Sequence, residues 1–207
     1  MAVYGDRNSY IRMRQGRASL TEELACPEVM NSELLEGLGS VEGVRGVAKA
    51  RQISCSPCFD IEGFLSSFKE VIEVVEDYNL SSDISGYIEY SHSDGRWIIG
   101  VNNFQGKPRQ RFTLAHELAH LVLHGAYIKQ KGRHEDKKLL RSDDEDMFDA
   151  VEKEADSFAG RLLMPISVIE EQIKSGNNTI AGLAECFNVS IAAMKYRLNE
   201  CGLDWIK

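Results

Sequence analysis

Three of the five histidines in the chain lie within nine residues of one another, in the stretch RFTLAHELAHLVLHG (111–125). On a helix, the four-residue spacing of His116 and His120 places both imidazoles on one face, where they can bind one zinc ion at about 2.0–2.1 Å. Glu117, next to the first histidine, can reach a water molecule at the metal and act as its general base. The HExxH pattern therefore predicts a hydrolytic metal centre.

A catalytic zinc site needs a third protein ligand and one open position. His124 is a poor third ligand, because three histidines in steps of four drift around the helix and rise about 12 Å in total. The longer motif HExxHxxGxxH also fails, since Leu123 and Ala126 occupy its last two defined positions. We therefore expect His124 to support the site from outside the ligand set, or to lie at the helix C-terminus, where a positive charge is favourable.

The segment VEKEADSFAGRLLMP (151–165) offers three carboxylates as the missing ligand. Glu152 and Asp156 are four residues apart and share one helix face, so Glu152 can bind the metal while Asp156 orients a histidine. Glu154 lies about 200° away around the same helix. The spacing favours Glu152 as the third ligand, with Glu154 as the alternative.

These residues must be positioned by the elements around them. Leu114, Leu118 and Leu121 form one apolar stripe, which predicts a helix from about residue 110 to residue 124. Gly125 is placed to end that helix. Residues 126–146 are polar and predict a long loop, a kind of segment that often carries function.

Further elements lie on both sides of this helix. Two β-rich segments, ISGYIEYS and RWIIGVN, flank the turn-forming HSDG and predict a hairpin with strands near 84–91 and 96–102. A helix from about residue 147 to residue 164 should stop at Pro165. The end of the chain has the spacing of a helix, a turn at residues 188–190, and a second helix.

Composition limits the class of protein. With 207 residues and 43% hydrophobic content, the chain suits one compact domain with at most a small appendage. We expect no transmembrane helix and no signal peptide, because the longest apolar runs are too short and the basic N-terminus precedes no apolar segment. Five irregularly spaced cysteines then indicate reduced thiols and a cytoplasmic protein.

The sequence predicts three segments: an irregular or poorly ordered arm (1–54), a catalytic domain (55–165) and a helical C-terminal subdomain (166–207). The net charge is −8 for the chain. Within 166–207, four basic and five acidic residues give −1, so the helix-turn-helix spacing there does not predict DNA binding. The CxxC pattern at Cys55 and Cys58 has no second pair to complete a zinc site, and we assign it no function.

Taken together, RQRFTLAHELAHLVLH and the later EKEADSFAGRLLMP resemble the ImmA/IrrE family of bacterial and phage metallo-endopeptidases. The preceding hairpin is also similar, and the resemblance covers roughly residues 55–200. It implies an α+β fold of the minimal zincin type. Such a fold has a small twisted β-sheet, an active-site helix, a glutamate helix and a helical C-terminal part. On this basis VIEVV (71–75) is predicted to be a strand.

The resemblance also implies a gluzincin-like site, with His116, His120 and Glu152 as metal ligands and Glu117 as the catalytic base. Zinc is the implied metal and manganese the alternative. Where the family usually has an asparagine, four residues after the ligand glutamate, this chain has Asp156.

Family members cleave helix-turn-helix repressors of the Xre type or are required to inactivate them, which relieves repression of a mobile element or a stress regulon. The resemblance therefore implies a repressor as the protein partner, with no direct contact to nucleic acid or membrane. A non-proteolytic antirepressor that binds the repressor is the rival interpretation, and a DNA-binding regulator is disfavoured by charge.

Two features of the mechanism stay open in the sequence. A substrate strand is expected to pair with the free edge of the hairpin. A donor for the tetrahedral oxyanion is still required. Tyr127 and His134 are candidates, although ordinary loop positions are the simpler interpretation of both.

Overall fold

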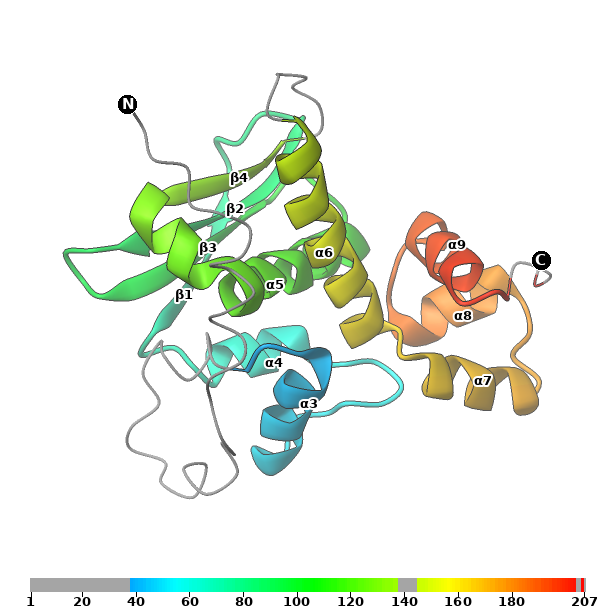
Figure 1. Cartoon of the computed structure of the whole chain (residues 1–207). Coiled ribbons are helices and arrows are strands. Elements are labelled where there is room, and N and C mark those ends of the chain that lie inside the picture. Colours follow the sequence, from blue (N-terminus) through cyan, green and yellow to red (C-terminus); the bar gives the residue numbers. More distant parts are fainter. Residues whose placement is uncertain (1–37, 138–144, 204–205, 207) are drawn as a thin grey trace. The chain divides into compact units, whose positions relative to one another are not determined.

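In the computed structural model of the protein, residues 38–137, 145–203 and 206 are described (Figure 1). They belong to one compact unit, Asn31–Lys207. Within the described part of the chain, a four-stranded sheet is combined with seven helices, so the predicted α+β class is confirmed.

The sheet has the strand order β1-β3-β2-β4. Its strands are β1 (Ile72–Asp77), β2 (Ile84–Ser91), β3 (Arg96–Asn102) and β4 (Arg133–Lys137). β1 runs parallel to β3, and β2 runs antiparallel to both β3 and β4. The predicted hairpin is confirmed as β2 and β3, with Gly95 in the turn at a φ of 66° that favours glycine. The strand predicted at VIEVV is confirmed as β1.

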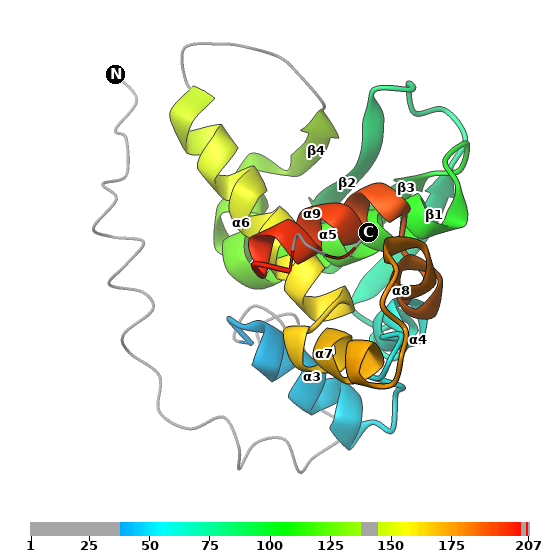
Figure 2. The same cartoon turned by 90° about the vertical axis from the view of Figure 1, so that its right-hand side faces the viewer.

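One helix organises the domain. α5 (Lys107–Lys131) lies along the sheet, and α6 (Glu145–Leu163) packs against α5, as the two views in Figures 1 and 2 show. The core between these layers is apolar, with Trp97, Ile99 and Leu118 fully buried. The helix that carries HExxH is therefore held from two sides, by β2 and β3 and by α6.

α5 is longer than the sequence predicted. Gly125 does not end it, because the next turn is anchored by Ile128, which is only 1% exposed. The helix ends instead at Gly132, whose φ of 90° suits a glycine. β4 follows at once, so the loop predicted for 126–146 is wrong for residues 126–137. Residues 138–144 lie outside the described part.

The irregular arm predicted for residues 1–54 is also too long. Residues Val41–Ala50 form helix α3, capped by the Ser40 hydroxyl, which accepts a hydrogen bond from the backbone N–H of Gly43 at 3.0 Å. Gly43 and Gly46 lower its helix propensity, but Val44 and Val47 bury an apolar face that outweighs this cost. Residues 1–37 lie outside the described part.

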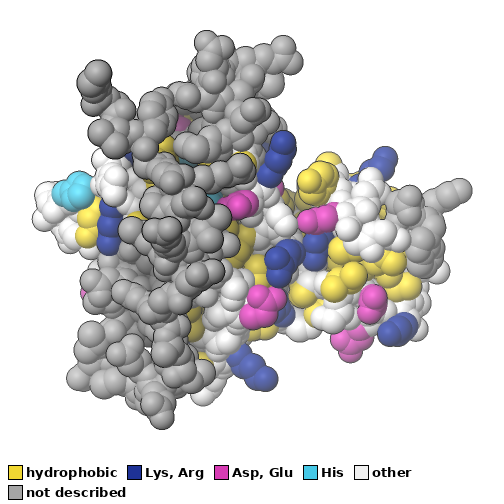
Figure 3. All heavy atoms as spheres, in the orientation of Figure 1, with side chains coloured by type: hydrophobic (Ala, Val, Ile, Leu, Met, Phe, Trp, Pro, Cys, Tyr) yellow, Lys and Arg dark blue, Asp and Glu magenta, His cyan; other side chains and the backbone are white. Residues whose placement is uncertain are grey.

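The remaining helices are α4 (Ile61–Ser66), α7 (Ile166–Lys174), α8 (Ile180–Phe187) and α9 (Ile191–Glu200). The predicted helix, turn and helix at the end of the chain are confirmed: Asn188 ends α8 in the left-handed region and Ser190 caps α9. Figure 3 shows apolar side chains among charged ones over these C-terminal helices. None of the helices in the described residues has the length and apolar character needed to cross a membrane.

Candidate metal centre

α5 and α6 bring three of the predicted site residues together. The Nε2 atoms of His116 and His120 lie 3.0 Å apart. From α6, the two carboxylate oxygens of Glu152 approach them, with Oε2 at 3.1 Å from His116 Nε2 and Oε1 at 3.4 Å from His120 Nε2. One potential ligand atom from each residue lies within 4.8 Å of the other two. In the described part of the chain, this is the group of side chains that could hold a metal ion.

The chemistry of these donors fits a zinc ion. Two imidazoles and one carboxylate are the ligand set of a catalytic zinc site with one open position. His120 is fully buried, and among the described residues no hydrogen-bond partner contacts its Nδ1 atom. Its other nitrogen, Nε2, is directed at His116 and Glu152, so a metal between the three side chains could use its lone pair.

The pKa values of the cluster follow from burial and close contacts. Burial lowers the pKa of His120 to about 3, so its imidazole is neutral and its lone pair can bind a metal. Burial also opposes the charge on His116, but hydrogen bonds to Asp156 and Glu152 and the charge of Glu117 raise its pKa well above 6.5. For Glu152, burial is outweighed by hydrogen bonds from His116, His120 and His134, which lower its pKa.

Glu117 is fully buried between α5 and the sheet. Gly86 of β2 makes room for it: a Cβ there would lie 2.4 Å from Thr113 Cγ2, 2.7 Å from the Gly100 carbonyl oxygen and 3.2 Å from Glu117 Oε1. The carboxylate charge reaches the first histidine of the cluster, as its effect on the pKa of His116 indicates. The predicted base therefore lies beside the predicted ligands.

The other two carboxylates considered as ligands, Asp156 and Glu154, have separate positions on α6. Asp156 Oδ1 accepts a hydrogen bond from His116 Nδ1 at 3.0 Å, which is the orienting contact predicted from its spacing. The side chain of Glu154 is 59% exposed, and its Oε2 atom lies 3.9 Å from His124 Nε2. The structure thus places Glu152, and not Glu154, with the two histidines.

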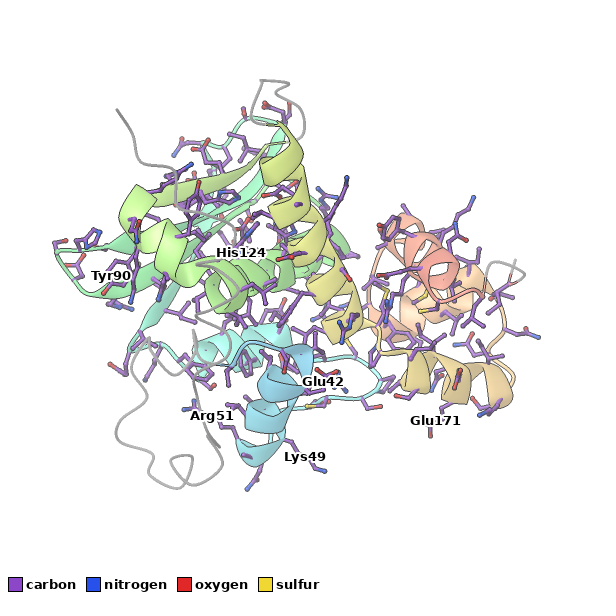
Figure 4. The ribbon with its side chains drawn as sticks, in the orientation of Figure 1. Glu42, Lys49, Arg51, Tyr90, His124 and Glu171 are labelled. Atoms are coloured by element: carbon purple, nitrogen blue, oxygen red, sulfur yellow. The ribbon has the colours of Figure 1, made fainter. Side chains whose placement is uncertain are left out.

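His124 lies outside the group, as predicted, but not at a helix terminus, because α5 continues for two further turns. It is 4% exposed, and its ring centroid is 5.5 Å from that of His120 (Figure 4). Burial lowers its pKa from 6.5. The side chain is therefore a neutral packing partner of a proposed ligand at neutral pH.

His134 is the site residue that sequence reasoning underestimated. It lies on β4, and its Nε2 is 2.8 Å from Glu152 Oε1. Its ring centroid is 4.5 Å from that of His120. Tyr127, the other oxyanion candidate, lies on α5 with Lys131 Nζ 4.7 Å from its ring centroid. No sequence signal placed a strand at residues 133–137, and only a strand brings residue 134 back to the site.

The comparisons with known proteins agree with this geometry. The sequence model of the IrrE N-terminal-like domain (Peptidase_M78) matches residues 74–199, a range that contains α5, β4 and α6. Among solved structures, a Mycobacterium tuberculosis transcriptional regulator has a similar fold, with a TM-score of 0.54 and 17% identity. The match covers 83% of this chain and 52% of that structure, so the chain spans about half of its length. No curated protein matches the sequence.

Proposed function

We propose, from the premise that this chain belongs to the family of IrrE N-terminal-like metallopeptidase domains, that it is a zinc-dependent endopeptidase acting on a helix-turn-helix repressor. The observation that carries the proposal is the joint position of three metal-binding side chains and one buried carboxylate. A purely structural metal site has no use for Glu117 beside it.

Each side chain has a distinct task in the proposed reaction. His116, His120 and Glu152 would hold the metal, with Asp156 fixing the tautomer of His116 through its Nδ1. A zinc ion held there would supply a Lewis acid, which would polarise the scissile carbonyl and make water easier to deprotonate. Glu117 then accepts the proton of the attacking water and passes it to the leaving amine.

The proposed path of the substrate differs from the one predicted from the sequence. The hairpin has no free edge, since β3 pairs with β1 and β2 pairs with β4. In the described residues, the open edge beside the metal centre is that of β4. We propose that a substrate strand pairs there by β-augmentation, which would place its backbone beside His134.

The repressor as substrate is supported by family membership, because the geometry of the site is not specific for any peptide. The expected consequence is relief of repression of a mobile element or stress regulon. A cytoplasmic site of action is part of the same proposal.

The proposal is tested with the repressor encoded nearest to the gene of this protein. Incubation with zinc should give repressor fragments, and a chelator should stop their formation. Glu117→Gln should reduce cleavage by about 10²–10⁴-fold while metal binding persists, because that is the usual contribution of a general base. Glu154→Gln, on α6 but outside the metal cluster and largely exposed, is the matched control and should cleave normally.

Three other outcomes would oppose the proposal. Full cleavage by Glu117→Gln would exclude this residue as the base. A stable complex with intact repressor would identify a non-proteolytic antirepressor. A shift of operator DNA by this protein alone would identify a DNA-binding regulator.

A further inference from the structure

We infer that His134 is a positioning residue: from strand β4 it donates a hydrogen bond to Glu152 and so fixes the carboxylate that completes the metal site. The inference rests on the proposed function only in requiring that the site binds a metal. It adds a third element to a centre that otherwise depends on α5 and α6.

The register of the sheet directs His134 toward the site. His134 is the partner of Ile88 across the β2–β4 pair, and cross-strand partners lie on the same face of a sheet. Ile88 is fully buried, and Gly86, two residues earlier, faces Glu117. The imidazole therefore projects from the edge strand toward α5 and α6, where its side chain is 11% exposed.

The contact itself has a defined polarity. A carboxylate that binds a metal is ionised and can only accept hydrogen bonds, so the proton lies on Nε2 of His134. The distance of 2.8 Å to Glu152 Oε1 is that of a strong, charge-assisted bond. Oε2 is left facing His116 Nε2 at 3.1 Å. His134 thus holds Oε1 of Glu152, which also lies 3.4 Å from His120 Nε2, and leaves Oε2 to face His116.

A hydrogen bond of this kind has a measurable effect on metal binding. Partners that orient metal ligands commonly contribute about 10–100-fold in affinity. Glu152 needs such a partner more than the histidines do, because a glutamate side chain has more freely rotating bonds than an imidazole that α5 already orients. We therefore expect the loss of His134 to appear first as weaker metal binding.

Two variants of similar size separate the hydrogen bond from the volume of the side chain. His134→Gln keeps an N–H donor at about the reach of the imidazole Nε2, whereas His134→Leu removes it. His92→Leu, an exposed histidine in the hairpin turn, is the matched control. Zinc affinity is measured by competition with a coloured chelator. Thermal melting of the metal-free proteins verifies that each variant is folded.

The expected result is a loss of about 10–100-fold in zinc affinity for His134→Leu, substantial recovery for His134→Gln and no change for His92→Leu. The absorption spectrum of the cobalt-substituted His134→Gln protein should match that of the unchanged protein. Unaltered zinc affinity in a folded His134→Leu protein would overturn the inference. A cobalt spectrum that changes in His134→Gln would also overturn it, by showing that His134 is itself a ligand.

These readouts do not depend on peptidase activity. If the protein cleaves no repressor but loses zinc affinity in His134→Leu, the proposed function fails and the inference stands. If the protein cleaves a repressor but its zinc affinity does not change in His134→Leu, only the inference fails.

Discussion

At the scale of single residues, the cluster couples metal binding to the loss of a proton. His116 carries a proton at pH 7 in the metal-free protein, because Asp156 and Glu152 hold its pKa well above 6.5 despite burial. A metal binds only the neutral imidazole nitrogen. We expect zinc binding at pH 7 to release about one proton, and the affinity to rise up to about tenfold per pH unit until the pH exceeds the pKa of His116.

Calorimetric titration in buffers of different ionisation enthalpy counts the released protons. Asp156→Asn is the control, because the neutral amide oxygen still accepts from Nδ1 but makes a weaker hydrogen bond than the carboxylate, and so raises the pKa of His116 less. Fewer protons should be released by that variant. Release of no proton by the unchanged protein at pH 7 would contradict the prediction.

The residues of the site differ in how far the sequence could predict them. His116, His120 and Glu117 follow from helix geometry within five positions, and that geometry is local. The choice between Glu152 and Glu154 depends on how α6 is rotated against α5. The four-residue spacing to Asp156 favoured Glu152, but the packing of the two helices determines the rotation. His134 could not be assigned, because its place depends on the pairing of β4 with β2, a contact between residues 46 positions apart in the register of Ile88 with His134.

At the scale of elements, Gly86 controls how closely α5 approaches the sheet. Gly86→Ala would place a methyl group within 2.4 Å of Thr113 and 2.7 Å of the Gly100 carbonyl, and backbone cannot yield cheaply. We expect a loss of about 1–3 kcal/mol in the free energy of unfolding, together with reduced activity, because the strained side of α5 carries Glu117.

The control for this change is Gly46→Ala in α3, where an added Cβ meets no atom within 4 Å. Replacing a glycine at an exposed position inside a helix should stabilise the protein by up to about 1 kcal/mol. Urea denaturation of both variants measures the two effects. Equal stability of Gly86→Ala and the unchanged protein would show that β2 and α5 separate without cost.

The elements also show where pattern reasoning succeeds and where it stops. The hairpin, α6 and the two C-terminal helices have clear apolar periodicity or are bounded by turn-forming residues. Their predicted bounds lie within about three residues of the observed ones. α3 was not predicted from the sequence, because Gly43 and Gly46 lower its helix propensity and so obscure the pattern of its apolar residues. The extension of α5 past Gly125 was missed because the burial of Ile128 is a tertiary effect, and β4 because RHEDK has no apolar alternation.

At the scale of the whole molecule, Arg111 joins three parts of the described chain. It lies on α5, 4% exposed, and donates to the carbonyl oxygens of Phe59 at 2.9 Å and Asn188 at 3.3 Å. It also contacts Cys58 Sγ at 3.1 Å and forms an ion pair with Glu62 at 3.5 Å. The segment before α4, helix α5 and the turn between α8 and α9 are therefore all linked by one guanidinium group.

Replacement of Arg111 should lower the stability of the protein. Arg111→Lys keeps the charge but cannot reach the buried carbonyl group of Phe59 and the carbonyl group of Asn188 at once, so we expect a loss of about 2–4 kcal/mol in the free energy of unfolding. Arg161→Lys is the control. Arg161 forms an exposed ion pair with Glu42, which is labelled in Figure 4, so this substitution should hardly change the free energy of unfolding. Thermal and urea unfolding compare the two, and similar stability of both variants would contradict the role of Arg111.

The division of the proposed ligands between α5 and α6 has a consequence for biosynthesis. A ribosome completes α5 well before α6, so a growing chain that has reached Gly132 carries both histidines and Glu117 but lacks Glu152. Two imidazoles alone form an incomplete site. The nascent protein therefore lacks the complete set of proposed metal ligands until Glu152 has been added.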